Sequence, residues 1–377
     1  MNTLSMQGGL AARNLWQCAR DRWQRERARD RLERACARIM RCKPAQGRAG
    51  FARKRAPTGA WLALLATLMA VPLGTTAQTT FPNKPITLSV GFAPGGGTDI
   101  SARLVAKKLA EQIGQPVNVD NKPGAGGNIA AEQAARANPD GYFIHLTNIG
   151  ALTVSPHTTK KLGYDPRKDF ALLSLAVQFP NVLVVGSAQP MRTLDDYVKA
   201  GRIKGAAIAY GTSGISSTGH LSGALLESIA RTDLTHVPYK GGGPAMADLL
   251  GNQVPSVFAS APTAVPQIKA GKIRALAVTS LRRAESLPEV PAIAESFAGY
   301  DVTNWYAFVA PVAMSRELAE RWNREIVKAL SDPTVRAHIK EHGMEAIPST
   351  QKELGDKIAR EYVLWERIVK QAGITAD

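Results

Sequence analysis

The chain has 377 residues and a formal net charge of +16 at pH 7. Residues 1–77 hold 15 of the 47 lysines and arginines and 4 of the 31 aspartates and glutamates, which leaves 32 basic and 27 acidic side chains for the other 300 residues. Because most of the excess positive charge lies in the N-terminal 77 residues, the composition of the remaining chain gives little support for a nucleic-acid partner.

Residues 1–77 are predicted to be a basic extension followed by a secretion signal. A basic stretch that ends at Arg55 precedes the apolar run 61–73, and Thr75 and Ala77 fit the small-residue rule for cleavage. The alternative is a membrane span, which needs about 20 apolar residues. The run is shorter than that and contains a proline, so we expect an exported mature chain that is not inserted in a membrane.

The leader has two further features. Residues 1–39 are too long and too rich in arginine for an ordinary signal, and Met40 offers another start, so we interpret them as a mis-called start. The alternative is a basic helix that binds a partner. All three cysteines precede the apolar run (Cys18, Cys36, Cys42). The mature chain is therefore predicted to have no disulfide, no thiolate metal site and no lipid-anchored cysteine.

From residue 86 onward, strands and helices are predicted to alternate. Helix 99–114 is predicted because Leu104, Val105 and Leu109 repeat with the 3.6-residue period of one helix face. The first cycle comprises strand 86–92, helix 99–114, strand 116–120, helix 129–137 and strand 142–147. This β-α-β-α-β order is typical of a parallel sheet with helices on its faces.

A second cycle follows the apolar run 171–186, which is predicted to be two strand segments broken at Pro180. Its elements are strand 206–210, a helix from about 220, strand 235–240, helix 246–250, and strands 254–260 and 273–280. Strand 304–311 and helices 315–330, 332–342 and 350–372 complete the chain. We expect two similar α/β domains: residues 78–179 and 304–377 form domain 1, and residues 180–303 form domain 2.

The same kind of loop joins the first strand to the first helix in each cycle. Gly95, Gly96 and Gly97 leave backbone N–H groups accessible at one helix start, where the helix dipole also favours anions. Thr98 or Asp99 could cap this helix. In the second loop, 211–217, four hydroxyls add donors (Thr212, Ser213, Ser216, Ser217). The two loops suggest a cleft that holds one acid from both sides, and a plain tight turn is the alternative.

Other site motifs do not fit. A dinucleotide fingerprint would need glycine where Ile100 stands, and no Gly-Lys-Ser/Thr follows for a P-loop. The nucleophile elbow fails because Ile215 stands where its last glycine should be. His338 and His342 lie on a polar helix that we interpret as solvated surface. We therefore predict no catalytic residue, no metal and no cofactor.

Several stretches carry a resemblance to a known family: APGGGTDISARL from Ala93, NKPGAGGNIAAEQAARANPDGY from Asn121, YGTSGISSTGHL from Tyr210 and HVPYKGGGPAMADLLGNQV from His236. On these residues the chain resembles the Bug-type periplasmic solute receptors, the substrate-binding proteins of tripartite tricarboxylate transporters. The resemblance runs from about residue 81 to 372. It implies an α/β, two-domain, periplasmic-binding-protein-like fold, each domain a mostly parallel sheet with helices on both faces, and a ligand cleft between them.

The resemblance also implies which residues bind the ligand. It makes the loops Phe92–Asp99 and Gly211–Ser217 the segments that hold a carboxylate, although the family usually has proline where this chain has Ala93. The predicted ligand-binding residues are Phe92, Ala93, Gly96, Gly97, Thr98, Asp99, Asn148, Thr212, Ser213, Ser216, Ser217, His220 and Tyr239. Each has a structural alternative as a cap, a turn residue or a packing residue. Trp305 and Tyr306 are interpreted as packing near the hinge, and lining the pocket is the alternative.

The predicted function is a periplasmic receptor that captures a small carboxylic acid for a tripartite tricarboxylate-type transporter. The implied partners are the acid and the membrane permease subunits, and we expect a monomer that does not act as an enzyme. One alternative is the same fold acting as the ligand sensor of a two-component system. A dinucleotide-dependent oxidoreductase is an alternative from another class, and both the missing fingerprint and the export signal count against it.

Overall fold

The computed structural model describes residues 81–372. The predicted extension, secretion signal and cleavage site lie outside this range. Within it, none of the helices is long and apolar enough to cross a lipid bilayer.

Two groups of strands and helices repeat one β-α-β-α-β arrangement. In the first, β1 (Ile86–Val90) lies between the parallel strands β2 (Val117–Asn121) and β3 (Phe143–Asn148). In the second, β5 (Ile208–Thr212) lies between the parallel strands β6 (Leu234–Pro238) and β7 (Ser256–Ser260). The connecting helices are α3 (Gly97–Ile113), α4 (Asn128–Ala135), α7 (Thr218–Ala230) and α8 (Gly242–Leu250). We call these groups, with the elements packed on them, the first lobe and the second lobe.

One strand passes through both lobes. β4 (Phe170–Gly186) pairs antiparallel with β9 (Thr303–Pro311) as far as Pro180, and from Asn181 onward it pairs antiparallel with β7. The predicted break at Pro180 is wrong, because the strand is continuous there. Proline lacks an N–H, and here it stands where the strand exchanges one neighbour for another, so few ladder hydrogen bonds are lost.

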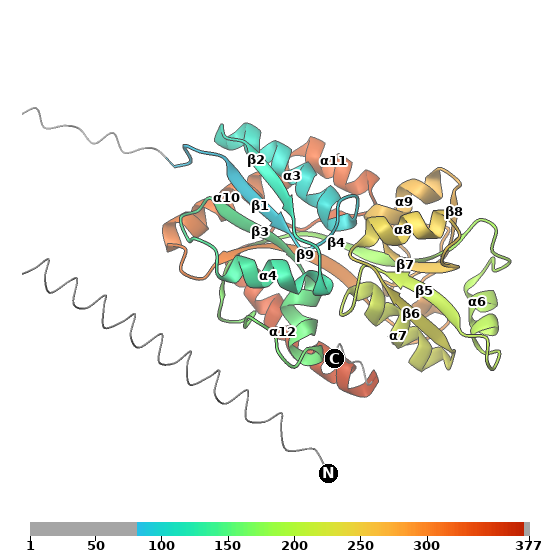
Figure 1. The fold of residues 1–377 in the computed structure, drawn as a ribbon. Helices are drawn as coiled ribbons and strands as arrows, with labels where there is room; N and C mark the ends of the chain where they lie inside the picture. The colour runs from blue at the N-terminus through green and yellow to red at the C-terminus, as the bar shows by residue number, and fades with distance from the viewer. Residues whose placement is uncertain (1–80, 373–377) are drawn as a thin grey trace, which may run out of the picture. The chain divides into compact units, whose positions relative to one another are not determined.

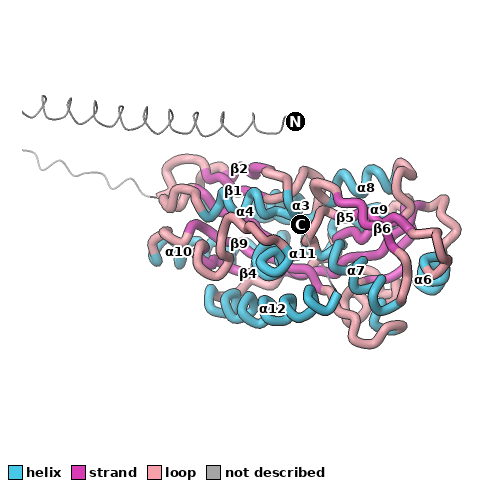
Figure 2. Tube along the Cα trace, turned by 60° about the horizontal axis from the view of Figure 1, so that its bottom comes forward, coloured by secondary structure: helices cyan, strands magenta, loops and turns pink. Residues whose placement is uncertain are grey.

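Two further strands complete the sheet. β8 (Ile273–Val278) and β10 (Glu345–Ala346) also pair with β4. In the first lobe β9 runs antiparallel to β3, and in the second lobe β4 runs antiparallel to β7. Each lobe therefore combines three parallel strands with antiparallel ones. In Figure 2 the strands run through the middle of the described part, with helices on both sides.

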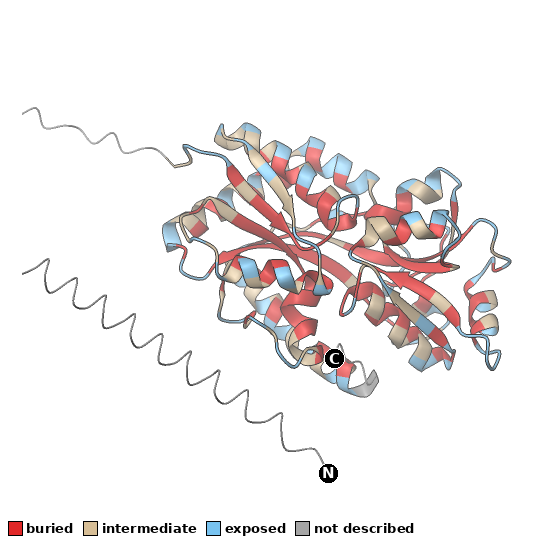
Figure 3. Ribbon diagram, viewed as in Figure 1, coloured by how far each residue is buried: buried red, intermediate tan, exposed pale blue. Residues whose placement is uncertain are grey.

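Each face of the sheet has its own hydrophobic core. On one face, α3, α10 (Arg316–Ser331), α11 (Pro333–Glu341), α8 and α9 (Ala261–Lys269) contribute to one buried cluster. On the other face, α4, α12 (Gln351–Ala372), α6 (Leu194–Gly201) and α7 contribute to the second. Figure 1 shows α3 and α11 opposite α4 and α12, and Figure 3 shows the strands largely buried between them. Both clusters include residues from both lobes, so the hydrophobic core on each face continues from one lobe into the other.

The predicted and observed elements agree in order. The three tail helices occur as α10, α11 and α12. Helix α3 starts at Gly97, two residues before the predicted start, so the triple glycine runs into the helix itself. The sequence did not predict α6, α9, or the π-helix η2 (Gly150–Val154) that continues into α5 (Ser155–Thr158).

Candidate functional site

The glycine loop after β1 is held in place by Asp99. This buried carboxylate accepts hydrogen bonds from the Gly95 amide (3.0 Å), from Asn121 Nδ2 (3.0 Å) and from Arg103 Nε (2.9 Å). Burial raises the pKa of Asp99, but the hydrogen bonds from Arg103, Gly95 and Asn121 outweigh it, and the net pKa is lowered. Asp99 therefore shapes the loop from behind and keeps its charge paired with Arg103.

The loop after β5 uses its hydroxyls in a similar way. Thr212 Oγ1 accepts from the Gly214 amide (3.1 Å) and bonds His236 Nε2 (2.7 Å), while Ser216 Oγ bonds Thr158 Oγ1 (2.8 Å). Ser217 caps α7, because its hydroxyl accepts from the His220 amide. Most of these hydroxyls thus fix the loop, and the backbone N–H groups at the start of α7 remain without intrahelical partners.

Four helices begin at one cavity between the lobes. The cavity is lined by Gly97 at the start of α3, Thr218 at the start of α7, Gly242 at the start of α8, and Ser260, the residue preceding α9. The positive ends of four helix dipoles, each equivalent to roughly half a charge, meet there. No charged side chain is among the lining residues. The arrangement is suited to binding anions through neutral donors.

Seven of the predicted ligand residues line this cavity. They are Phe92, Gly96, Gly97, Thr98, Asn148, Ser213 and Ser217. They come from both glycine- and serine-rich loops and from the end of β3. The structure therefore brings the two predicted loops to one place at the carboxyl ends of the parallel strands, where ligands bind in open α/β sheets.

The other six predicted residues lie outside the lining: Ala93, Asp99, Thr212, Ser216, His220 and Tyr239. Asp99, Thr212 and Ser216 make the loop contacts described above. The Ala93 amide donates to the Lys240 carbonyl (3.0 Å) and so links the lobes. Each of these residues has a partner within the protein, and the structure gives each a supporting role beside the cavity.

His220 and Tyr239 are turned toward partners of their own lobe. The His220 ring stacks on His236, with centroids 4.1 Å apart, and its Nδ1 accepts from the Ser216 amide. Burial lowers the pKa of His220 to about 4 and that of His236 to about 3, the latter with a contribution from His220. The Tyr239 hydroxyl donates to Asp248 Oδ2 (2.7 Å), and burial raises its pKa to about 12.

The sequence did not identify several polar residues of the cavity. Asn181 and Asn304 lie where the paired strands β4 and β9 pass between the lobes, and Ser260 ends β7. Tyr306, for which the sequence favoured packing over lining the pocket, also lines the cavity and bonds Thr98. Asn304 is buried, and its Oδ1 has no hydrogen-bond partner. A buried polar atom without a partner is costly, so this amide is available to a ligand or a water. No local motif marks these positions, since they meet only through the sheet pairing.

The lobes touch closely around the cavity. A Cβ built on Gly243 would lie 2.6 Å from the Pro94 carbonyl oxygen, and one on Gly150 would lie 2.7 Å from the Ser216 carbonyl oxygen. The cavity volume is about 20 Å³, which is room for roughly one water molecule. An acid of several carbons therefore enters only if the lobes separate at this face.

Metal chemistry finds no support in the described residues. No group of three or more His, Cys, Asp or Glu side chains between residues 81 and 372 is placed to hold a metal ion. The exposed His338 contacts Glu341, and His342 bonds the His338 carbonyl. Both histidines therefore interact with residues of α11.

Fold and site together define a two-lobed solute-binding protein of the periplasmic-binding-protein type. Residues 101–374 match the family model described as the tripartite tricarboxylate transporter family receptor, TctC. The chain belongs to this family, and the resemblance to Bug-type receptors is confirmed.

Known proteins support this assignment. The chain is 36% identical over 299 residues to the UPF0065 protein of the tcbD-tcbE intergenic region of Pseudomonas sp. (strain P51), covering 79% of this chain and 89% of the relative. The structure of R. palustris Rpa4515 with adipate has a TM-score of 0.76 at 33% identity, covering 78% of this chain and 99% of that one. MatC from Rhodopseudomonas palustris with bound malate has a TM-score of 0.71 at 28% identity, covering 77% and 100%.

Proposed function

We propose that this chain is a periplasmic receptor that captures a small carboxylic acid and delivers it to the permease subunits of a tripartite tricarboxylate-type transporter. The observation that carries the proposal is the convergence of four helix starts, from both lobes, on one uncharged cavity. A carboxylate placed there gains the N–H groups and the dipoles of the helices at no cost in competing negative side chains.

Binding proceeds in two stages in this proposal. The acid first meets one lobe while the lobes are apart, and the second lobe then closes on it. Gly97 and Thr98 of the first lobe and Ser213 and Thr218 of the second lobe supply donors to the same ligand. Closure depends on the acid because the acid binds the closed arrangement more tightly than the open one.

Two relatives indicate which acids to test. Rpa4515 is a structure with adipate and MatC is a structure with malate, and both ligands are dicarboxylic acids. A dicarboxylate suits a cavity with helix starts on both sides, because each carboxylate can meet a different pair of helices. We therefore propose small dicarboxylates as the first class of ligand.

The remaining parts of the proposal concern the setting. We propose that residues 1–77 direct export, that the mature chain works in the periplasm, and that it is a monomer with domains 78–179 plus 304–377 and 180–303. The closed pair of lobes would present the surface that the permease recognises. N-terminal sequencing of the exported protein and size-exclusion chromatography test these parts directly.

Isothermal titration of the mature protein with adipate, malate and other mono-, di- and tricarboxylates tests the ligand. We expect saturable binding of at least one acid, and no binding of adipamide, which lacks the negative charges. A correctly folded protein that binds none of the acids would contradict the proposal.

A glycine pair provides the matched variants. In Gly97→Ala, the added methyl group would lie 2.7 Å from Ser260 Oγ and 2.9 Å from the Tyr306 hydroxyl oxygen, inside the cavity. We expect acid affinity to fall tenfold or more, about 1.4 kcal/mol. Gly355→Ala, on α12, meets only Leu172 at an ordinary 3.4 Å and should leave affinity unchanged. Equal affinities of both variants would place the ligand elsewhere.

A further inference from the structure

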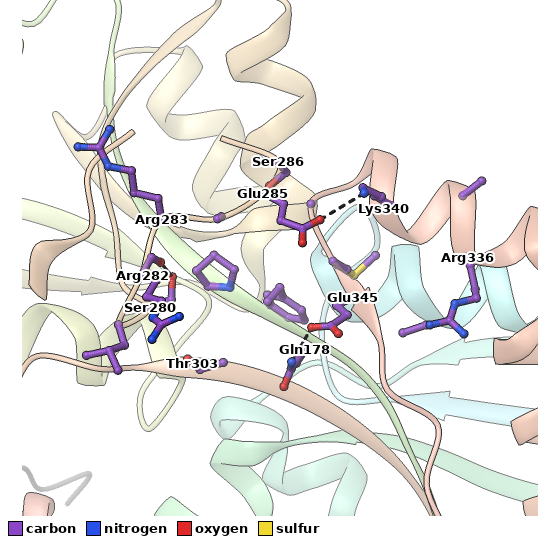
Figure 4. A pocket seen from close by; sticks show the side chains of 18 of the residues that line it. Gln178, Ser280, Arg282, Arg283, Glu285, Ser286, Thr303, Arg336, Lys340 and Glu345 are labelled. Atoms are coloured by element: carbon purple, nitrogen blue, oxygen red, sulfur yellow. Dashed lines mark hydrogen bonds and ion pairs between the residues drawn. The ribbon is translucent and has the colours of Figure 1, made fainter. Parts of the chain in front are cut away.

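A large groove lies beside the strands that join the lobes, apart from the interlobe cavity. Its volume is about 760 Å³, and it shares no lining residue with the cavity. Small-molecule sites in proteins have volumes of roughly 300–1,000 Å³, so the groove is large enough for a metabolite-sized ligand. Figure 4 shows it as an open space between the loop that carries Ser280 to Ser286 and helix α11.

The floor of the groove is apolar and its walls come from different lobes. Phe179 and Pro180 of β4 and Met344 beside β10 line the floor but are largely covered, and the exposed Leu281 supplies accessible apolar surface to the lining. One wall is the segment Ser280–Ser286 that follows β8 in the second lobe. The other wall is α11 and the turn into β10 in the first lobe. An apolar floor of this kind favours the hydrocarbon part of a ligand.

The charges on the walls do not balance. Lys340 pairs with Glu285 across the groove (3.2 Å), and Arg283 pairs with Glu295 through two 2.8 Å hydrogen bonds. Gln178 donates to Glu345 (2.6 Å). Figure 4 shows Glu285 facing Lys340 across the groove, and Gln178 facing Glu345. Gln178 is neutral, so Glu345 keeps its charge, and the lining as a whole has four basic side chains against two acidic ones.

Two arginines are left over. The Arg282 and Arg336 side chains are exposed, and within residues 81–372 neither has a hydrogen-bond or ion-pair partner. They stand on opposite walls, one from each lobe. The Ser286 hydroxyl, also on the lining, is buried without a partner. Guanidinium groups bind carboxylate and sulfonate oxygens through two parallel hydrogen bonds.

We propose that this groove is a second ligand site, which takes an organic anion with an apolar body. The body lies on Leu281 and on the accessible edges of Phe179, Pro180 and Met344, and the acidic groups meet Arg282 and Arg336. A dianion long enough to reach both walls bridges the two lobes. The site differs in chemistry from the interlobe cavity, because its charge comes from side chains rather than from helix starts, so binding here weakens as salt rises.

The test uses two probes, the fluorescent 8-anilinonaphthalene-1-sulfonate and the dianion decanedioate, each titrated onto the mature protein. We expect saturable binding of both, weakened severalfold between 0.05 and 0.5 M NaCl. Arg282→Gln with Arg336→Gln should reduce affinity at least tenfold. The matched control is Arg324→Gln on α10, which removes an exposed arginine that lies outside the groove.

The outcomes separate this site from the cavity. In Gly97→Ala the added methyl group would meet Ser260, Pro262 and Tyr306, none of which lines the groove, so this variant should leave probe affinity unchanged. Melting temperatures check that every variant is folded. The proposal fails if neither probe binds, if the double arginine variant binds like the Arg324→Gln control, or if Gly97→Ala abolishes probe binding.

Discussion

The Ala93 backbone amide donates a hydrogen bond to the Lys240 carbonyl, 3.0 Å away, and so joins the two lobes by their main chains beside the cavity. The neighbouring contacts are also between backbones: Gly243 lies against the Pro94 carbonyl, and Gly150 against the Ser216 carbonyl. Main-chain contacts of this closeness allow no side chain between the lobes. The closed arrangement therefore depends on glycine at these positions.

Replacing Gly243 should hold the lobes apart without unfolding either one. In Gly243→Ala the new methyl group would lie 2.6 Å from the Pro94 carbonyl oxygen and 3.3 Å from the Gly95 carbonyl carbon, both in the other lobe. We expect acid affinity to fall at least tenfold with little change in melting temperature. Small-angle scattering with saturating acid should give a larger radius of gyration than for the wild type.

The matched control for that variant is Gly251→Ala, at the other end of α8. Its Cβ would meet only atoms of its own lobe, at 3.4 Å or more. If Gly243→Ala binds acid as tightly as this control, the glycine contacts do not limit closure.

Removing the Asp99 carboxylate should loosen the first glycine loop. Asp99→Ala removes the acceptor of the Gly95 amide and the ion-pair partner of Arg103, while Asn121 Nδ2 keeps the Phe92 carbonyl as its other acceptor. We expect the free energy of unfolding to fall by about 2 kcal/mol, a typical contribution of hydrogen bonds to a charged group, and acid affinity to fall as well. Urea unfolding and calorimetry measure the two effects. A variant as stable as the wild type would show that the loop keeps its shape without this carboxylate.

Salt should have little effect on acid binding in the cavity. The lining includes no charged side chain, and the donors are backbone N–H groups, hydroxyls and amides. We expect the Kd of the acid to change less than about twofold between 0.05 and 0.5 M NaCl, because screening acts mainly on exposed charges. Titrations across this range test the expectation. A steep loss of affinity would mean that a side-chain cation carries the binding.

Mild acid should destabilise the protein through His145, which is buried, and through His220 and His236, which are half-buried. Burial lowers the pKa of His145 and of His220 to about 4, and that of His236 to about 3, from 6.5. The unfolded chain therefore binds protons that the native state does not. The contribution of these histidines to the free energy of unfolding is fully present above pH 6.5. It is lost as the pH falls from 6.5 toward 4, at up to about 1.4 kcal/mol per pH unit for each histidine.

The His236→Gln variant tests this pH dependence, because glutamine can replace the Nε2 contact to the Thr212 hydroxyl without titrating. Its unfolding free energy should change less between pH 7 and pH 4.5 than that of the wild type. The same substitution at the exposed His338 is the control. An unchanged slope in His236→Gln would exclude this histidine as a source of the acid sensitivity.

Most of the fold could be predicted from the sequence because its signals are local. The period of α3, the alternation of strands and helices, and the glycine loop Gly95–Gly97 each follow from neighbouring residues. The strand through Pro180 was misjudged because the residue's missing N–H is tolerated where β4 changes neighbours, a fact of tertiary structure. The π-helix η2 likewise has no pattern that separates it from a loop.

The candidate site was predicted only in part, for a related reason. The loops at the starts of α3 and α7 carry their own signal, whereas Asn181, Ser260 and Asn304 come together only through the pairing of β4, β7 and β9. The sequence also could not tell a hydroxyl that faces the cavity from one that faces its own loop. Ser213 and Ser216, three residues apart, lie on these two sides.

The uncharged lining of the cavity affects how the bound acid would be released from the proposed receptor. If an arginine or lysine side chain bound the acid, release of the acid would leave that charged side chain desolvated and without a partner, at a cost of several kcal/mol. Backbone amides at helix tips are rehydrated by water as soon as the lobes part. A transporter that separates the lobes would therefore need little free energy to release the acid. The receptor could then bind another acid without delay.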